Sequence, residues 1–239
     1  MPRTLAKSSH PPQFSFLELS ERGCFLSEGK EVDQLQVPDF LKRAIGLASD
    51  VTDVFVWVHG WRNDRDIALQ AAGRLFDGIN YVFSGKPARY PGLINFKPAF
   101  VAVHWPSMSW PFFCGYRKIR ERAHQRTENG YAEYALAFLL GYLEQKQPVS
   151  RSKGRGVLRA SGGFYVHCVG HSFGCRFLAQ AVIAAANPSP PTLALLPPNQ
   201  RFEFTVDTFL GFQMAAPSDI FGDRLKMLIE EAPLQGPIC

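Results

Sequence analysis

Residues 164–174 read FYVHCVGHSFG, and this stretch decides how the rest of the chain is interpreted. It places Ser172 in a Gly-x-Ser-x-Gly pattern directly after an apolar run that is typical of a buried strand. The Ala-rich run 175–186 then continues without Gly or Pro and stops before Asn187-Pro188, as a helix does. Strand, tight turn and helix together predict a nucleophile elbow, whose glycines allow neighbouring backbone to approach closely. The alternative is a structural serine in an ordinary strand-to-helix turn.

The bulk composition is that of a globular protein. The chain has 239 residues, of which 46% are hydrophobic and 20% charged. This length can bury a sizeable core, so we expect a single domain over residues 1–239, with residues 1–12 as a disordered tail. No apolar run approaches the roughly 20 residues that cross a bilayer, and the N-terminus lacks the apolar core of a signal peptide. We therefore expect no transmembrane segment and a cytoplasmic location.

Cysteine spacing and charge indicate no cofactor. The five cysteines lack C-x-x-C spacing, which argues against a disulfide framework and a zinc site, and Cys168 and Cys175 are interpreted as small core residues. The net charge of +5 draws mainly on basic clusters within residues 117–126 and 151–159. Neither cluster has the interleaved aromatic residues of a nucleic-acid-binding surface, so both are interpreted as solvated. We expect no metal, no cofactor and no nucleic-acid partner.

Apolar runs alternate with helical patterns along the chain. The extended segments 14–17 and 24–26, separated by a turn, predict an N-terminal β-hairpin. Beyond it, strands are predicted at 54–58, 100–105, 164–170 and 206–214, and helices at 39–48, 65–76, 131–143, 175–186 and 221–230. This alternation predicts an α/β protein, a three-layer α/β/α sandwich with a mostly parallel sheet. The carboxyl ends of parallel strands share one edge of the sheet, where ligands bind in such folds.

A second motif ends the strand predicted at 54–58. His59-Gly60-Trp61 lies at the same sheet edge as Ser172, because both follow parallel strands. Acyl transfer develops negative charge on a carbonyl oxygen, and each backbone N–H aimed at that oxygen lowers the barrier by about 3 kcal/mol. We expect the amides of Phe173 and Trp61 to form this oxyanion hole. His59 itself is interpreted as a residue that holds the loop by hydrogen bonds.

These motifs together resemble a known family. His59-Gly60-Trp61, Trp105-Pro106-Ser107 and the G-H-S-x-G motif at 170–174 resemble the α/β-hydrolase fold family, and more narrowly its lipase-like serine-hydrolase branch. The resemblance covers roughly residues 53–223. It implies an esterase- or lipase-like serine hydrolase that acts on a small-molecule ester or other acyl substrate. For residues 105–107 the simpler interpretation is a strand-ending turn with a packed Trp.

The family's acid follows the elbow in the chain. Asp219 comes just after the last predicted strand and resembles that acid, which would orient a histidine and stabilise its imidazolium. The alternative is that Asp219 caps the helix predicted at 221–230, since Asp is a preferred N-cap residue. Asp207 and Asp223 are weaker candidates for the acid.

The sequence departs from the family pattern in the histidine that serves as general base. All six histidines precede Ser172, whereas the resemblance implies a histidine after the final strand. His171 adjoins the serine, but side chains of successive residues in such a turn are expected to diverge. His124 lies in a segment that could fold over the strand ends, and it is the one substitute for this general base.

The predicted fold is also short at its C-terminal end. The chain ends at Cys239 without sequence for two further strands, so we expect a C-terminally truncated fold with an exposed sheet edge. The leading hypothesis is a serine hydrolase with Ser172 as nucleophile. The second is a catalytically impaired or truncated α/β-hydrolase-like protein that acts as a binding or interaction module.

Overall fold

The structure is a computed structural model, and it describes residues 14–85, 89, 95–108, 131–146, 163–186, 206–223, 225–230, 234 and 238–239. Residues 1–12, His124 and the basic clusters within 117–126 and 151–159 lie outside the described residues, so the predictions made for them stay predictions.

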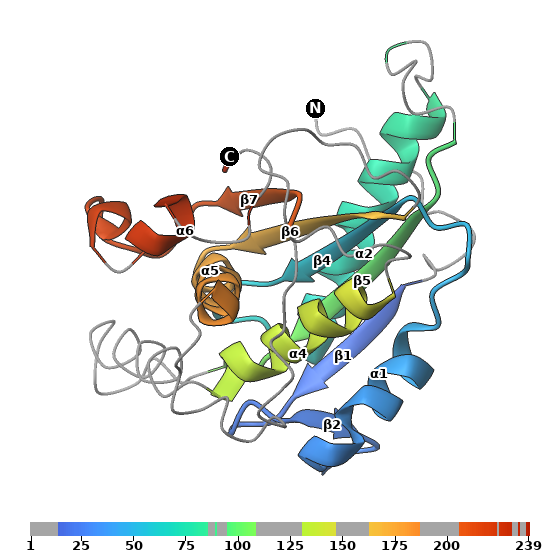
Figure 1. Cartoon of the computed structure of the whole chain (residues 1–239), viewed down its shortest axis with the longest axis horizontal. Helices are drawn as coiled ribbons and strands as arrows, with labels where there is room; N and C mark the ends of the chain where they lie inside the picture. Colours follow the sequence, from blue (N-terminus) through green and yellow to red (C-terminus); the bar gives the residue numbers. More distant parts are fainter. Residues whose placement is uncertain are drawn as a thin grey trace.

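Seven strands form one mixed sheet in the order β3-β2-β1-β5-β4-β6-β7 (Figure 1). The five strands β1, β5, β4, β6 and β7 run parallel, and β1, β2 and β3 form an antiparallel meander at one edge. Their bounds are β1 Ser15–Leu19, β2 Phe25–Ser27, β3 Lys30–Glu31, β4 Asp53–Val58, β5 Pro98–His104, β6 Tyr165–His171 and β7 Thr208–Phe212. The α/β class, the mostly parallel sheet and the N-terminal hairpin are confirmed; β3 was not predicted.

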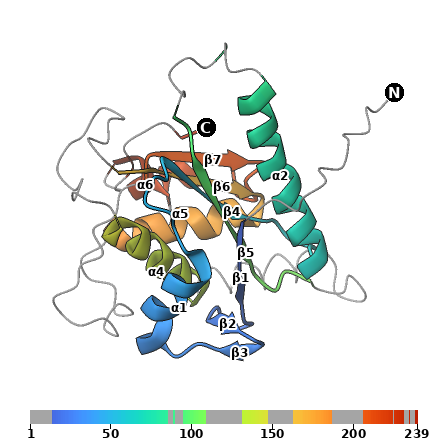
Figure 2. The ribbon, with the colours of Figure 1, turned by 90° about the vertical axis from the view of Figure 1, so that its right-hand side faces the viewer.

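Helices cover both faces of the sheet (Figure 2). On one face lie α1 (Val37–Ile45), α4 (Tyr131–Gln145) and α5 (Phe173–Ala186), and on the other lies α2 (Arg65–Gly85). Side chains alternate across each strand, so Val56 of β4 joins the core beneath α4 and α5 while Trp57 packs with Phe76 of α2. This two-sided burial explains why β4 reads as a continuous apolar run.

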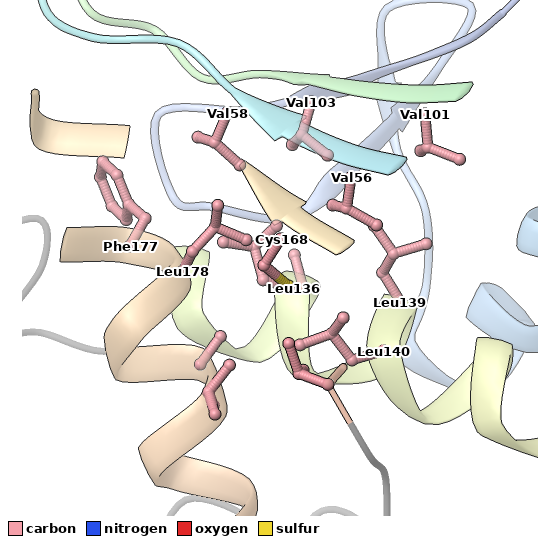
Figure 3. Close-up of a cluster of buried hydrophobic side chains, with 14 of the residues drawn as sticks. Val56, Val58, Val101, Val103, Leu136, Leu139, Leu140, Cys168, Phe177 and Leu178 are labelled. Carbon is pink, nitrogen blue, oxygen red and sulfur yellow. The ribbon is translucent and has the colours of Figure 1, made fainter. Parts of the chain in front are cut away.

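The larger core lies between the sheet and the pair α4 and α5 (Figure 3). Leu139 of α4 and Leu178 of α5 are fully buried against Val56 and Cys168 of the central strands. Because the apolar side of α5 is held in this core, the start of α5 is fixed relative to the ends of β4 and β6.

Several predicted boundaries differ from the structure. α2 continues to Gly85, nine residues beyond the predicted end, and Asp64 accepts a hydrogen bond from the amide of Ile67 as its cap. The helix predicted at 221–230 is instead a 3-10 turn η5 (Ile220–Gly222) followed by a short α6 (Lys226–Glu230). In the described part of the chain, no helix is both long and apolar enough to cross a membrane.

The sheet edge at β7 is partly covered, which corrects the expectation of an exposed edge. Leu234 and Ile238 form parallel bridges with Val206 and Phe209, and the carbonyl of Cys239 accepts a 2.7 Å hydrogen bond from the amide of Gly211. The sequence 234–239 carries no alternation strong enough to predict a strand, and its pairing depends on the backbone groups that β7 presents.

Replacing Leu178 tests how far the site rests on this core. We expect Leu178→Ala to lower the free energy of unfolding by about 2–5 kcal/mol, because it opens a cavity beneath α5. Leu35→Ala is the matched control, since Leu35 is 86% exposed and its loss should change stability by less than about 0.5 kcal/mol. Urea unfolding of both variants measures the difference, and equal stabilities would contradict the core assignment.

Candidate functional site

Ser172 occupies a strained turn between β6 and α5. Its φ of 55° lies in the left-handed region, a conformation that costs free energy for any residue other than glycine. Residues in such strained conformations are concentrated at functional sites. The amide of Ser172 donates a 2.8 Å hydrogen bond to the carbonyl of Phe212 at the end of β7. Its carbonyl accepts a 3.2 Å bond from the amide of Cys175, which starts the helix. The sequence therefore predicted the position and shape of this turn correctly.

Two glycines of the pattern are required by close backbone contacts. A Cβ on Gly174 would overlap the carbonyl oxygen of Val58 and lie 2.7 Å from that of His59. A Cβ on Gly170 would lie 2.7 Å from the Cα and amide nitrogen of Cys175. Both distances are shorter than real Cβ contacts. Glycine at 174 therefore lets the turn pack on the end of β4, and glycine at 170 lets the end of β6 pack on the start of α5.

The loop after β4 lies directly beside the serine. A Cβ on Gly60 would lie 3.0 Å from the Cβ of Ser172 and 2.7 Å from Nδ1 of His171. The adjacent Trp61, half-buried, follows Gly60 at the same sheet edge. The structure thus brings the His59-Gly60-Trp61 loop and the serine turn together, as the parallel pairing of β4 and β6 requires.

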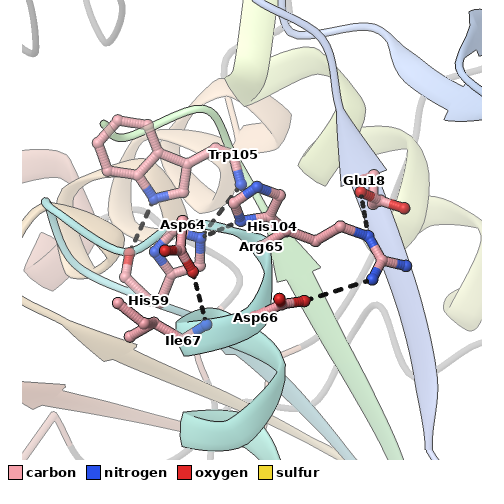
Figure 4. A network of polar contacts seen from close by, with 8 residues as sticks. All are labelled: Glu18, His59, Asp64, Arg65, Asp66, Ile67, His104 and Trp105. Atoms are coloured by element: carbon pink, nitrogen blue, oxygen red, sulfur yellow. Dashed lines mark hydrogen bonds and ion pairs between the residues drawn. The ribbon is translucent and has the colours of Figure 1, made fainter. Parts of the chain in front are cut away.

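His59 fastens this loop to the end of β5 (Figure 4). Its Nδ1–H donates to the carbonyl of Gly60 at 2.7 Å, and its Nε2 accepts from the amide of Trp105 at 3.3 Å. Since Nε2 is an acceptor, Nδ1 of His104, 2.9 Å away, carries the proton and donates to it. The indole N–H of Trp105 donates to the carbonyl of His59 at 2.8 Å. The predicted structural role of His59 is confirmed.

Burial keeps His59 neutral. Its pKa is lowered to about 4, mainly by desolvation. The hydrogen bond to the carbonyl of Gly60 opposes this shift, and the charge that His104 or His171 would carry adds to it. Desolvation also lowers the pKa of His104. Both ring nitrogens of His59 are engaged in hydrogen bonds, so His59 is excluded as the base that accepts a proton from Ser172.

Trp105-Pro106-Ser107 does more than end a strand. The Ser107 hydroxyl donates to the carbonyl of Asn63 at 2.8 Å and accepts from the amide of Asn63 at 3.0 Å. The backbone carbonyl of Ser107 accepts a hydrogen bond from the amide of Arg62, which has a φ of 61°. The guanidinium of Arg62 lies 5.7 Å from the ring centroid of Trp61. The sequence did not predict this contact, because no local pattern connects residues 63 and 107.

The candidate acids lie in different places. Asp219 is exposed at the position before η5, and its side chain makes no capping hydrogen bond there, so its role as an N-cap is not observed. Asp207 is buried just before the start of β7, where it accepts a 2.6 Å hydrogen bond from the amide of Val166. That end of the sheet is opposite Ser172, so Asp207 is excluded as the acid. Asp223 is exposed after η5.

His171 and Ser172 both adjoin the loop after β4. Both side chains lie against Gly60, because the left-handed serine folds the chain back over the β4 loop. The Nε2 atom of His171 lies 3.3 Å from Oε1 of Gln213, a residue with φ 49° that directly follows β7. Sequence reasoning missed Gln213; the available signal was a polar residue at the carboxyl end of a predicted parallel strand.

The cysteines behind the turn are packing residues. Cys168 and Cys175 are fully buried, which confirms their interpretation. Burial raises the pKa of both thiols, that of Cys175 to about 12, so neither is a nucleophile near neutral pH. Ser172 is the chemically distinctive residue of this turn.

Comparison of the chain with models of protein families, with curated proteins and with solved structures finds no match. The function is therefore inferred from the residues at this sheet edge and from their geometry.

A methyl group at Gly174 tests the close packing of the turn. We expect Gly174→Ala to destabilise the protein by about 1–3 kcal/mol or more, because the Cβ meets rigid backbone of β4. Gly78→Ala is the matched control: Gly78 lies in α2 with open space around it, and the same change should stabilise the helix by about 0.5–1 kcal/mol. Thermal unfolding compares them, and a neutral Gly174→Ala would rule out the close approach.

The buried His59 predicts a loss of stability in mild acid. Its folded pKa is depressed to about 4, so between pH 6.5 and 4 the unfolded chain binds a proton that the folded protein does not. The free energy of unfolding should therefore fall by about 3 kcal/mol as pH decreases through this window. His59→Gln, measured by urea unfolding against pH, should show a shallower slope; equal slopes would contradict the assignment.

Proposed function

We propose that this chain is a serine hydrolase of the α/β-hydrolase type that acts on a small-molecule ester or other acyl substrate. The observation that carries the proposal is Ser172 in a left-handed turn between a central parallel strand and a helix. Such a turn presents the hydroxyl at the sheet edge where ligands bind in parallel α/β folds. The strain at Ser172 has a chemical reason under this proposal and none under a purely structural one.

The oxyanion hole is formed by two backbone amides in this proposal. Phe173 is the first residue of α5, where the helix macrodipole favours negative charge. Trp61 follows Gly60, which packs against Ser172, and its amide is the second donor in this proposal. The bonds from His59, Trp105 and Ser107 hold this loop in place before substrate arrives.

The reaction is acyl transfer to Ser172. Its oxygen attacks the acyl carbonyl, the two amides stabilise the developing oxyanion, the alcohol leaves, and water hydrolyses the acyl-enzyme. Asp219 is the proposed acid, placed beyond β7 as the family resemblance implies. The resemblance itself assigns no histidine to this chain.

The hydrolase fold is likewise a proposal. Its support is the order β5-β4-β6-β7, in which the strand that ends in the His59-Gly60-Trp61 loop lies next to the strand that ends in Ser172. Leu234 and Ile238, which form parallel bridges with Val206 and Phe209, lie where a further strand would pair in this interpretation.

A binding or interaction module is the second candidate function. It is favoured by one observation: His59 and His104, two histidines at this sheet edge, are hydrogen-bonded to each other. Turnover of a short acyl ester that disappears in Ser172→Ala would exclude this candidate.

Covalent labelling tests the nucleophile. We expect a fluorophosphonate probe to label Ser172 and the label to disappear in Ser172→Ala, since the probe reacts only with an activated serine. Ser27→Ala, at an exposed serine at the end of β2, is the matched control and should label like the wild type. Intact-protein mass spectrometry gives the readout. Absence of label under conditions in which a known serine hydrolase reacts would overturn the proposal.

A further inference from the structure

His171 and Ser172 present their side chains to the same small space. The position that a Cβ on Gly60 would take lies 2.7 Å from Nδ1 of His171 and 3.0 Å from the Cβ of Ser172. Nδ1 and this Cβ are therefore no more than about 6 Å apart, a span that the serine hydroxyl and one direct or water-bridged hydrogen bond can cover. Gly60 has no side chain that would occupy this position between His171 and Ser172.

Gln213 orients the imidazole. Its Oε1 faces Nε2 of His171 at 3.3 Å, and an amide oxygen can only accept, so Nε2 carries the proton. The neutral ring then has its lone pair on Nδ1, the nitrogen that faces Gly60. Gln213 is held beside the turn because the preceding residue, Phe212, accepts the hydrogen bond from the amide of Ser172.

Strain supports the same arrangement. Ser172 and Gln213 both have positive φ, 55° and 49°, and they lie next to each other at the ends of β6 and β7. Neither is a glycine, so each conformation costs free energy that surrounding contacts must offset. The two strained residues are those that flank His171.

The other described histidines are occupied elsewhere. His59 uses both ring nitrogens within the loop, and His104 donates to it from β5, two strands away from β6. His167 lies between Asp53 and Thr208, near the start of the strands and away from Ser172. Within the described chain, His171 is the histidine whose Nδ1 adjoins the same point of the Gly60 backbone as the Cβ of Ser172.

Building on the serine hydrolase proposed above, we propose that His171 is the general base for Ser172 and that Gln213 positions it. As the Oγ–C bond to the acyl carbon forms, the Oγ proton passes to Nδ1 and the carbonyl π pair moves to the oxygen. The carbonyl then re-forms, the C–O bond to the alcohol breaks, and the alkoxide takes the proton from Nδ1–H. Water repeats the sequence and releases the acid and Ser172. Throughout, Nε2–H stays bonded to Oε1 of Gln213.

The surroundings of His171 fit this role. His59, which faces it from the β4 loop, has a pKa of about 4 and stays neutral where histidine ordinarily titrates, so it adds no opposing charge. Gln213, which faces it from the end of β7, is uncharged. It orients the ring but stabilises the imidazolium less than a carboxylate would. This chain therefore has an orienting residue whose replacement by Glu should improve the base.

The experiment measures the rate of fluorophosphonate labelling of Ser172 against pH through the histidine range. His171→Gln should lower the rate by about 10²–10⁴-fold and remove the pH step, and imidazole added to His171→Ala should restore part of the rate. Gln213→Glu should raise the rate and move the step to higher pH, because a carboxylate favours the imidazolium. Gln34→Glu, at an exposed position in the 3-10 helix η1 (Gln34–Gln36), adds the same charge and should behave as wild type.

Each outcome decides between the two proposals. A wild-type chain that is not labelled overturns the hydrolase and its base together. Labelling with an unchanged pH profile in His171→Gln overturns His171 as the base and leaves the nucleophile standing. If His171 variants do not fold, the comparison of Gln213→Glu with Gln34→Glu decides. A pH profile of labelling that moves only in Gln213→Glu supports His171 as the base, and a Gln213→Glu profile that matches that of Gln34→Glu overturns it.

Discussion

The candidate site depends on one steric constraint, the packing of the serine turn onto the end of β4 with no side chain between them. Gly174, in the first turn of α5, lies on the carbonyls of Val58 and His59, and Gly60, in the loop after β4, lies on His171 and Ser172. This mutual approach brings the first amides of α5 and the loop after β4 to one place. The serine hydrolase proposed above would use both, and a single methyl group on either side would separate them.

A buried polar cluster holds the loop side of this contact. His59, His104 and Trp105 satisfy one another's hydrogen-bonding groups at the ends of β4 and β5 (Figure 4). Next to them, Ser107 binds both backbone groups of Asn63. Because His59 is buried and its pKa is about 4, the cluster is neutral and rigid near neutral pH. Its residues hold the loop after β4 by hydrogen bonds.

Local pattern predicted the parts of this protein whose structure is set by neighbours in the chain. The strand, turn and helix around Ser172 follow from buried-strand composition, glycine spacing and an Ala-rich run, and the mostly parallel sheet follows from alternating elements. The errors fall where distant segments meet. The helix predicted at 221–230 is broken, and the edge expected to be exposed at β7 is bridged by Leu234 and Ile238. Neither the break in the helix nor the bridging of β7 is indicated by the residues of the segment itself.

The sequence by itself determined the α/β class, the turn at Ser172 and the glycines it needs, because backbone sterics and side-chain periodicity act over a few residues. The tertiary structure decided which polar side chains meet at the sheet edge. It pairs His59 with His104, Ser107 with Asn63, and His171 with Gln213, three contacts between residues 42 to 45 positions apart. Such pairs depend on strand order and register, which are settled by the packing of the whole sheet rather than by any single stretch of the chain.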